Sequence, residues 1–496
     1  MKRNFVGITC TRCGKRSPTE SPVPACLRCG GRLEVQMDLE RMRSSISQSS
    51  LRASRQRGIW KYRDMLPVMN PRSVLSLGEG YTNLLRSESL AHILGMRRLF
   101  IKDETTNPSG SFLDRGMAVE VSRARALGFR SAACAWSGNL AASLAAYCAR
   151  GGMRSRAYLP GEIDLGKLYQ VVAYGAEIVP SKGKEEANAN LLEPGEEFYP
   201  VTGSNPFFLE GMKTTAIETV DQLDWTAPDW IVLPVGNGVH LSMLAKGLRE
   251  VESQGLLDEV HTKFLAVQVE GCSPIVDAIK GPSKNPRIAA SSFARDIAVQ
   301  RPSMGDEAVE AIRETGGDAV AVSEREMLDS VKLLARNEGI FAEPASASTV
   351  AGLRKLVESG AVRRSDTVVV LVTGIGLKDP VMARSIAAKN RVARSMISRH
   401  EGAAVTHRIG ASKSAILSII SGGADYAYSI RKRLAAEFDR QMSLVSVYQH
   451  LSELEALGLI IVERRERSPE RRIRVYYSLT ESGSEFLESE GSIPKA

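Results

Sequence analysis

The chain lacks any apolar run long enough to cross a membrane, and it is poor in aromatic residues and cysteines. Its 496 residues include 6% aromatic residues, four tryptophans and seven cysteines. The most apolar stretch, residues 131–149, is interrupted by Gly138 and Asn139, and the N-terminus lacks the apolar core of a signal peptide. These absences exclude a membrane protein and a secreted disulfide framework, so we expect a cytoplasmic protein.

The composition is that of a globular protein with more than one domain. Apolar residues make up 43% and charged residues 25% of the chain. The net charge of +8 is uneven, because residues 1–63 hold fourteen Lys or Arg against four Asp or Glu, an excess of ten. Such a basic end can contact phosphates or can simply be a solvated surface.

Four of the seven cysteines form two C-x-x-C pairs in residues 1–40, each pair followed by glycine. Paired thiolates in tight turns supply four tetrahedral sulfur ligands for Zn²⁺. With four protein ligands the metal would be structural and would supply the folding energy of a small zinc ribbon. The predicted ligands are Cys10, Cys13, Cys26 and Cys29.

Residues 60–390 alternate short apolar strands with helical patterns, which is typical of an α/β domain with a parallel sheet covered on both faces. We predict strands at residues 98–103, 131–136, 155–160, 176–180, 230–235, 264–270 and 367–374.

Two further segments follow this α/β domain. Residues 381–411 are basic and resemble a linker. Residues 412–490 contain three amphipathic helical patterns, two strands and a last helix, which is the plan of a winged helix-turn-helix domain. The complete prediction is therefore a zinc ribbon, an α/β domain, a linker and a winged helix.

Six ordered motifs of the α/β domain resemble threonine synthase, a pyridoxal-phosphate enzyme of fold type II related to the tryptophan synthase β subunit. They are "SLGEGYTNLL", "IKDETTNPSGSFLDRG", "WSGNLAASLAAYCARGG", "PVGNGVHL", "GIFAEPASASTVAGL" and "VVLVTGIGLKDP". The similarity covers residues 1–390, zinc ribbon included. The resemblance implies a homodimer and a cofactor pocket.

The resemblance also suggests which residues would hold that cofactor. The loop after residues 230–235 would cradle the phosphate, since glycines leave backbone N–H groups unobstructed at a helix N-terminus. Asn139 is similar to the family residue that contacts the cofactor ring oxygen, and Thr373 lies where the family places a hydroxyl beside the pyridine nitrogen. Ser137, Gly138 and Trp136 would contact the substrate or effector. The phosphate-loop residues are Gly236, Asn237, Gly238, Val239 and His240.

One position departs from the family in a way that removes chemistry. The family motif ends "GSFKDRG", and its lysine forms the Schiff base with pyridoxal phosphate, whereas this chain has Leu113. Leucine has no amine, so it can neither form the internal aldimine nor move protons. A buried leucine instead contributes about 1.5–3 kcal/mol of apolar burial. Pyridoxal phosphate, if it binds, would therefore bind without a covalent bond.

The C-terminal segment resembles the PadR-type winged-helix regulators, in "SVYQHLSELEALGLI" and "YYSLTESGSEFL". The resemblance implies a recognition helix in the major groove of double-stranded DNA and a basic wing on phosphates or the minor groove. A protein-contact module is the alternative, because residues 412–496 are neutral overall. The candidate DNA-binding residues are Ser443, Ser446, Tyr448, Gln449, Arg464, Arg465, Arg467, Arg471 and Arg472.

Three functions agree with these patterns. The first is a transcription regulator whose catalytically silent domain senses an amino acid or a phosphorylated metabolite. The second is a working pyridoxal-phosphate enzyme, threonine synthase or a related lyase, with an appended regulatory domain. The third is a scaffold whose old active site is dead. Leu113 argues against the second, and failure to bind any ligand would favour the third.

Overall fold

The computed structural model describes the chain except residues 1–3, 21, 23, 69, 136, 162, 194–196, 283–294, 388–392, 394–395, 398–409, 468–472 and 491–496. At 385, 456, 465, 467, 473 and 488–490 only the backbone is described. The chain divides into two compact units, residues 1–383 and 384–496.

The first unit begins with a small antiparallel sheet in the order β2-β1-β3. Two ion pairs near the start of β3 join this sheet to the rest of the unit: Arg32 to Glu307 at 3.1 Å and Lys246 to Glu34 at 3.0 Å. Two short helices lead onward. These elements are β1 (Phe5–Cys10), β2 (Arg16–Ser17), β3 (Leu33–Met37), α1 (Leu39–Ser45) and α2 (Gln48–Arg52).

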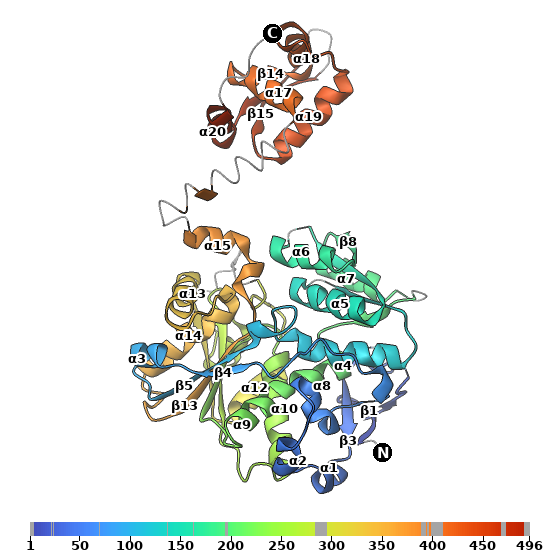
Figure 1. The fold of residues 1–496 in the computed structure, drawn as a ribbon, viewed down its shortest axis with the longest axis vertical. Helices are drawn as coiled ribbons and strands as arrows, with labels where there is room; N and C mark the ends of the chain where they lie inside the picture. Colours follow the sequence, from blue (N-terminus) through green and yellow to red (C-terminus); the bar gives the residue numbers. More distant parts are fainter. Residues whose placement is uncertain are drawn as a thin grey trace. The chain divides into compact units, whose positions relative to one another are not determined.

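The larger sheet of the first unit has six strands in the order β12-β11-β10-β13-β5-β4. Figure 1 labels its strands β4, β5 and β13. All pairs are parallel except β4 with β5. The central strand "WIVLP" is buried at every residue, as expected where helices cover both faces. The strands are β4 (Asn83–Arg86), β5 (Arg98–Asp103), β10 (Trp230–Pro234), β11 (Lys263–Val269), β12 (Asp318–Val322) and β13 (Thr367–Val372).

Eight helices belong to the chain segments around this sheet among the described residues. They are α3 (Ser89–Leu94), α8 (Pro206–Met212), α9 (Thr214–Gln222), α10 (Val239–Ser253), α11 (Pro274–Lys280), α12 (Gly305–Glu314), α13 (Glu324–Glu338) and α14 (Pro344–Glu358).

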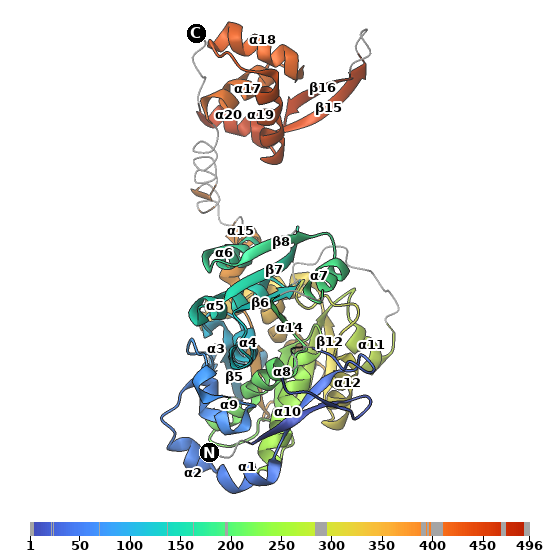
Figure 2. The same ribbon diagram turned by 90° about the vertical axis from the view of Figure 1, so that its right-hand side faces the viewer.

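A second, smaller parallel sheet has the order β8-β7-β6-β9. Figure 2 shows its strands β6, β7 and β8 side by side, with α5, α6 and α7 close to them. Its elements are β6 (Ser131–Ala135), β7 (Arg154–Pro160), β8 (Glu177–Ser181), β9 (Tyr199–Val201), α4 (Leu113–Ala126), α5 (Gly138–Gly151), α6 (Leu165–Ala173) and α7 (Lys184–Leu191).

The α/β class and all seven predicted strands are confirmed, but the single sheet expected from the sequence is wrong. The strands divide between two sheets, because an alternating strand–helix pattern predicts parallel pairing without saying which strands become neighbours. Strands β4, β9 and β12 were not predicted. Strands β4 and β9 have only four and three residues, whereas β12 (DAVAV) is apolar at four of its five positions and was missed nonetheless.

The second unit is a winged helix, as the pattern of residues 412–490 predicted. Three helices pack around Leu417, Ile430 and Leu451, and β15 pairs antiparallel with β16. Its elements are α17 (Ala411–Ser421), β14 (Asp425–Tyr426), α18 (Ala427–Phe438), α19 (Leu444–Ala456), β15 (Ile460–Arg467), β16 (Ile473–Leu479) and α20 (Glu481–Glu490). The boundary between the units falls within α15 (Pro380–Ala387), which covers the first residues of the segment predicted to be a linker.

Candidate functional site

A cavity of about 1670 Å³ opens in the first unit at the carboxyl ends of strands from both sheets. Loops that follow β6, β7, β9, β10 and β13 line it. The carboxyl end is where parallel α/β sheets bind ligands, because helix N-termini and loop backbones converge there. The segment before α12, residues 295–303, closes another part of the wall.

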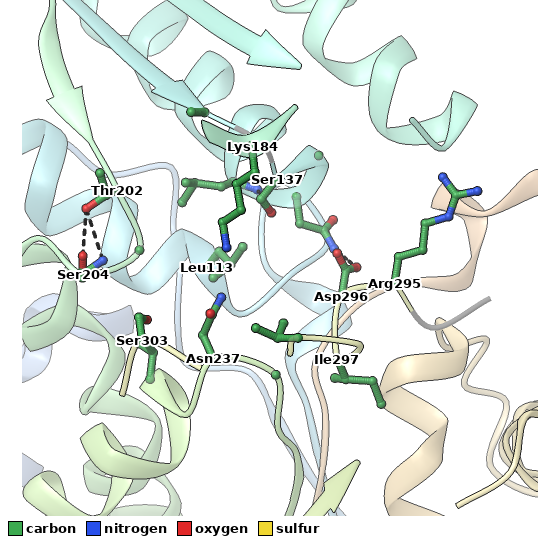
Figure 3. A pocket seen from close by; sticks show the side chains of 18 of the residues that line it. Leu113, Ser137, Lys184, Thr202, Ser204, Asn237, Arg295, Asp296, Ile297 and Ser303 are labelled. Atoms are coloured by element: carbon green, nitrogen blue, oxygen red, sulfur yellow. Dashed lines mark hydrogen bonds between the residues drawn. The ribbon is translucent and has the colours of Figure 1, made fainter. Parts of the chain in front are cut away.

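Leu113 lies on the wall of this cavity as the first residue of α4 (Figure 3). Its side chain is half-buried and packs against the core of the unit. The preceding Phe112 stacks on His240, with ring centroids 4.4 Å apart. The structure thus places a hydrocarbon where the resemblance expects an amine.

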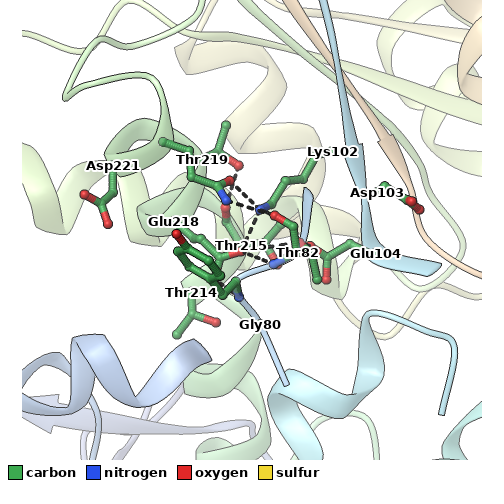
Figure 4. Close-up of polar contacts among 12 residues, drawn as sticks. Gly80, Thr82, Lys102, Asp103, Glu104, Thr214, Thr215, Glu218, Thr219 and Asp221 are labelled. Carbon is green, nitrogen blue, oxygen red and sulfur yellow. Dashed lines mark hydrogen bonds and ion pairs between the residues drawn. The ribbon is translucent and has the colours of Figure 1, made fainter. Parts of the chain in front are cut away.

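A buried ion network includes Arg115 near the start of α4, and Figure 4 shows its members Lys102, Glu104 and Glu218. The Arg115 guanidinium donates to both oxygens of Glu104, each at 2.7 Å, and to Glu218 at 2.8 Å. Lys102 donates to the same Glu218 oxygen at 2.6 Å. Burial alone would raise the pKa of Glu218, but the two cations outweigh it and hold that pKa well below its usual range. This network lies two residues along α4 from position 113.

The predicted phosphate loop forms a concentration of free backbone amides. Among the described residues, none accepts a hydrogen bond from the N–H groups of residues 236–241, which end at the first turn of α10. Glycine is required here, since a Cβ on Gly238 would lie 2.2 Å from the Met304 carbonyl oxygen, and its φ is +81°. Converging amides at the N-terminus of a fifteen-residue helix suit an anion such as a phosphate.

His240 is nine-tenths buried beside this loop. Its Nε2 lies 3.2 Å from the Thr215 hydroxyl, and its Nδ1 has no hydrogen-bond partner in the described part of the chain. Burial lowers the pKa of His240 to about 3, so the ring is neutral at physiological pH. Val239 opens α10 and also lines the cavity.

The end of the cavity expected to hold a cofactor ring carries charged groups. Asn139 donates to Asp296 at 3.2 Å and to Glu343 at 3.2 Å, and it accepts from Lys378 at 2.8 Å. Lys167 lies 2.7 Å from the same Asp296. A ring oxygen could reach the Asn139 amide only by displacing one of these carboxylates.

The remaining predicted residues of this end lie beside the same cavity. Thr373 is hydrogen-bonded to Ser346 at 2.8 Å. Ser137 caps α5 by accepting from the Leu140 amide, and both Ser137 and Gly138 line the cavity. Trp136, predicted to contact the effector, lies outside the described residues.

A pyridoxal phosphate molecule would find part of what it needs here. The unpartnered amides of residues 236–241 suit a phosphate, and Asn139 and Thr373, which the resemblance expects beside the ring, line the same cavity. Leu113 has no amine and therefore cannot bind the cofactor covalently. The geometry fits non-covalent binding and does not fit covalent binding through that position.

The sequence did not point to Lys184 or Asp296, both of which reach the cavity. Lys184 is the first residue of α7 and extends into the cavity from the smaller sheet (Figure 3). Asp296 lies in a segment whose sequence matches none of the motifs used for the prediction. Only the topology brings these segments to the same cavity, and no local pattern could have indicated it.

The four predicted zinc ligands form one cluster. Their sulfur atoms all lie within 4.8 Å of one another, with Cys10 to Cys29 at 3.5 Å and Cys13 to Cys26 at 3.7 Å. Four thiolates around tetrahedral Zn²⁺ at 2.3 Å would be separated by about 3.8 Å. The cluster is therefore compatible with zinc.

The candidate DNA-contact residues fall on two elements of the second unit. Ser443 caps α19 and accepts from the Ser446 amide at 3.1 Å. On the same helix Tyr448 is half-exposed, and Gln449 donates to Glu453 at 3.2 Å. Leu457, the residue that follows the last residue of α19, is 37% exposed.

The wing supplies the other candidates. Arg464 donates to Glu463 at 3.0 Å and Glu466 at 2.9 Å, and its guanidinium covers the Tyr476 ring at 4.2 Å. Arg465 and Arg467 lie on β15, where only their backbone is described. Arg471 and Arg472 lie outside the described residues.

Comparison with known proteins assigns a family to a region in each of the two units. Residues 75–374 match the family described as "Pyridoxal-phosphate dependent enzyme", and residues 416–489 match the "Transcriptional regulator PadR-like family". The threonine synthase of Methanocaldococcus jannaschii is 42% identical over 381 residues, which cover 75% of this chain and 92% of that protein. The threonine synthase of Methanosarcina acetivorans is 39% identical with the same coverage.

Solved structures agree on the fold. Maize serine racemase superposes with a TM-score of 0.50 at 20% identity, covering 62% of this chain and 92% of that chain. The processed form of threonine deaminase isoform 2 from Solanum lycopersicum has the same TM-score and identity, and the match covers 59% of this chain and 78% of that chain.

Within the described residues, no helix is long and apolar enough to span a membrane.

Proposed function

The chain belongs to the family of pyridoxal-phosphate dependent enzymes and carries a PadR-like regulator domain, and from this premise we propose that it is a transcription regulator. Its enzyme-like domain, residues 60–390, would sense an amino acid or a phosphorylated metabolite without catalysis. Its winged helix, residues 412–490, would bind double-stranded DNA. The observation that carries this proposal is Leu113 on the cavity wall.

Two structural features support the sensing part. The cavity retains the amides of residues 236–241 and the polar side chains around Asn139, so it can still hold an anionic ligand. It lacks the amine at position 113 that the reaction needs. A ligand can regulate only if it binds two states of the chain unequally, so the essential test is whether ligand changes DNA affinity.

The DNA-binding part rests on α19 and the wing. Ser443, Ser446, Tyr448 and Gln449 lie along the N-terminal part of α19, which is the part that enters the major groove in winged helices. Arg464, Arg465, Arg467, Arg471 and Arg472 would contact phosphates from the wing. We also propose that the chain binds DNA as a homodimer, and that the Cys10–Cys29 cluster holds structural Zn²⁺.

The test uses the purified full-length chain. Selection from random duplex DNA followed by fluorescence anisotropy should yield a specific site, and adding amino acids or phosphate esters should shift its apparent Kd. Arg464→Ala should weaken binding and reduce the salt dependence by about one unit of slope. Arg249→Ala removes the same charge from an exposed ion pair in the first unit and should change neither. Failure to select any sequence would contradict the regulator proposal.

A second candidate, a working pyridoxal-phosphate enzyme, is favoured by one observation. Lys378 is buried 2.8 Å from Asn139, and burial lowers its pKa, which favours the neutral amine. Together with the 42% identity to a threonine synthase, this observation supports an active enzyme in which Lys378 takes the place of the missing Schiff-base lysine. Borohydride reduction in the presence of the cofactor, followed by peptide mass analysis, would support this candidate if it labelled Lys378.

A further inference from the structure

The most exposed large apolar side chain in the described part of the chain lies at the start of α19, in the second unit. Val445 is the second residue of this helix, close to the cap formed by Ser443, and it is 77% exposed. Single exposed apolar residues are common on protein surfaces, so exposure by itself does not identify a contact. The place of Val445 in the helix is what distinguishes it.

The helix α19 has two different faces. Val447 and Leu451 are fully buried and belong to the core of the second unit, to which Val445 does not contribute. Val445 lies on the other face, which continues one and two turns later with the exposed polar residues Gln449 and Ser452. Val445 is therefore an apolar side chain at the beginning of a polar, solvent-facing stripe.

The charges along α19 allow this end of the helix to approach a polyanion. Residues 444–452, the first turns of the helix, contain no Asp or Glu. The first acid of the helix, Glu453, lies 2.5 Å from Lys413, which compensates its charge. The free amides at the N-terminus of a helix also favour a nearby negative charge. The beginning of α19 can therefore come close to DNA phosphates without repulsion from an acid of its own.

Duplex DNA offers one kind of apolar group to a helix in the major groove. The base edges present hydrogen-bond donors and acceptors there, and thymine adds its C5-methyl group. The N-terminal residues of a recognition helix are the ones that reach these edges. Because valine can neither donate nor accept a hydrogen bond, the thymine methyl is the base group that its side chain can contact favourably.

We propose that Val445 is a specificity-determining residue of the winged helix, and that its side chain contacts the C5-methyl group of a thymine in the major groove. This inference rests on the proposed DNA-binding function, which the match of residues 416–489 to PadR-like regulators supports, and it names a base group that the bound site contains. Val445 was not among the residues that the sequence indicated for DNA contact. It adds a preference for thymine to the hydrogen bonds that the polar residues of α19 can form.

The test removes the methyl group from the DNA. A specific duplex is selected from random sequences with the full-length chain, and each of its thymines is then replaced in turn by deoxyuridine, which lacks only the C5-methyl group. Dissociation constants are measured by fluorescence anisotropy at one fixed salt concentration. For the unaltered chain, replacement of one particular thymine should weaken binding about fourfold, as expected for one methyl group that is no longer buried.

Variants at position 445 remove the apolar group from the protein instead. Val445→Ala should bind the thymine duplex about as weakly as the unaltered chain binds the deoxyuridine duplex, and it should no longer distinguish the two. Val445→Ile keeps the apolar contact and should retain the preference for thymine. Both variants should fold, because the residue is exposed and alanine is the best helix former, and thermal melts check this.

Two further variants serve as controls. Val172→Ala makes the same exchange on α6 of the first unit, where Val172 is 57% exposed, and should change neither the affinity nor the preference for thymine. Arg464→Ala should weaken binding of the thymine and deoxyuridine duplexes by the same factor, because a phosphate contact is insensitive to the methyl group.

Two results would overturn this proposal and leave the regulator proposal intact. One is a selected site with no thymine whose replacement weakens binding of the unaltered chain, and the other is an unchanged preference for thymine in Val445→Ala. Failure to select any sequence would contradict both proposals. Loss of the preference in Val445→Ala, with its retention in Val172→Ala, would support the contact between Val445 and the thymine methyl.

Discussion

Restoring the missing amine is the sharpest perturbation that the structure offers. Leu113→Lys places an ammonium at the first residue of α4, on the cavity wall, with the helix start held by the network around Arg115. Because that network does not involve the side chain at position 113, the variant should fold with α4 in place. Its new amine should then project into the cavity that Leu113 lines.

The cost in stability can be worked from the position. Leu113 is half-buried, so its replacement forfeits about 1 kcal/mol of apolar burial. A positive charge at a helix N-terminus costs a further 0.3–1 kcal/mol or so. The free energy of unfolding should therefore fall by about 1–2 kcal/mol in urea titrations. Leu113→Met, which keeps an unbranched apolar chain without an amine, should cost less than 1.5 kcal/mol or so.

The assay is spectroscopic and does not require turnover. The full-length variant is mixed with pyridoxal 5′-phosphate, its absorption spectrum is recorded, and borohydride reduction is followed by peptide mass analysis. A visible imine band and a pyridoxyl group at position 113 are expected for Leu113→Lys alone. Absence of that adduct, or an equally strong adduct in the unaltered chain, would refute the view that a single side chain separates this cavity from covalent cofactor binding.

Three further predictions concern stability and metal. Glu218→Gln should destabilise the first unit by about 3–5 kcal/mol in urea titrations, because it leaves Lys102 and Arg115 with an uncompensated buried charge; a loss below 1 kcal/mol would contradict this. Cys13→Ser should abolish stoichiometric zinc measured by mass spectrometry, whereas a serine at Cys272, outside the cluster, should not. The pKa of His240 is about 3 in the folded chain, and in the unfolded chain it is about 6.5. The free energy of unfolding should therefore fall as the pH decreases between these values, by about 2 kcal/mol at pH 5. His240→Gln should remove this part of the pH dependence of the free energy of unfolding, measured by urea titrations at several pH values.

The sequence predicted what local patterns encode. Continuous apolar runs identified the strand at residues 230–234, and paired cysteines identified the sulfur cluster. In α19 the side chains of Leu451 and Leu454 are fully buried, whereas Leu457, just beyond the helix end, is 37% exposed. Periodicity specifies which face is apolar but not the residue at which a helix stops.

The contents of the cavity could be predicted only in part. Position 113 and the loop at residues 236–240 were found because their motifs are contiguous. Lys184 and Asp296 were missed because each reaches the cavity from a separate segment of the chain, and the pairing of Asp296 with Lys167 joins residues 129 positions apart. Such contacts depend on how two sheets pack, which no single stretch of sequence encodes.

The polar content of the cavity also bears on whether the domain is only a scaffold. A scaffold gains nothing from amide groups that find no protein acceptor, and burying such groups unsatisfied costs about 1–3 kcal/mol each. The N–H groups of residues 236–241 and the buried Nδ1 of His240 have no partner among the described residues, and position 113 carries no amine. Backbone donors beside a position that carries no amine support the proposal that the site binds an anion without catalysis.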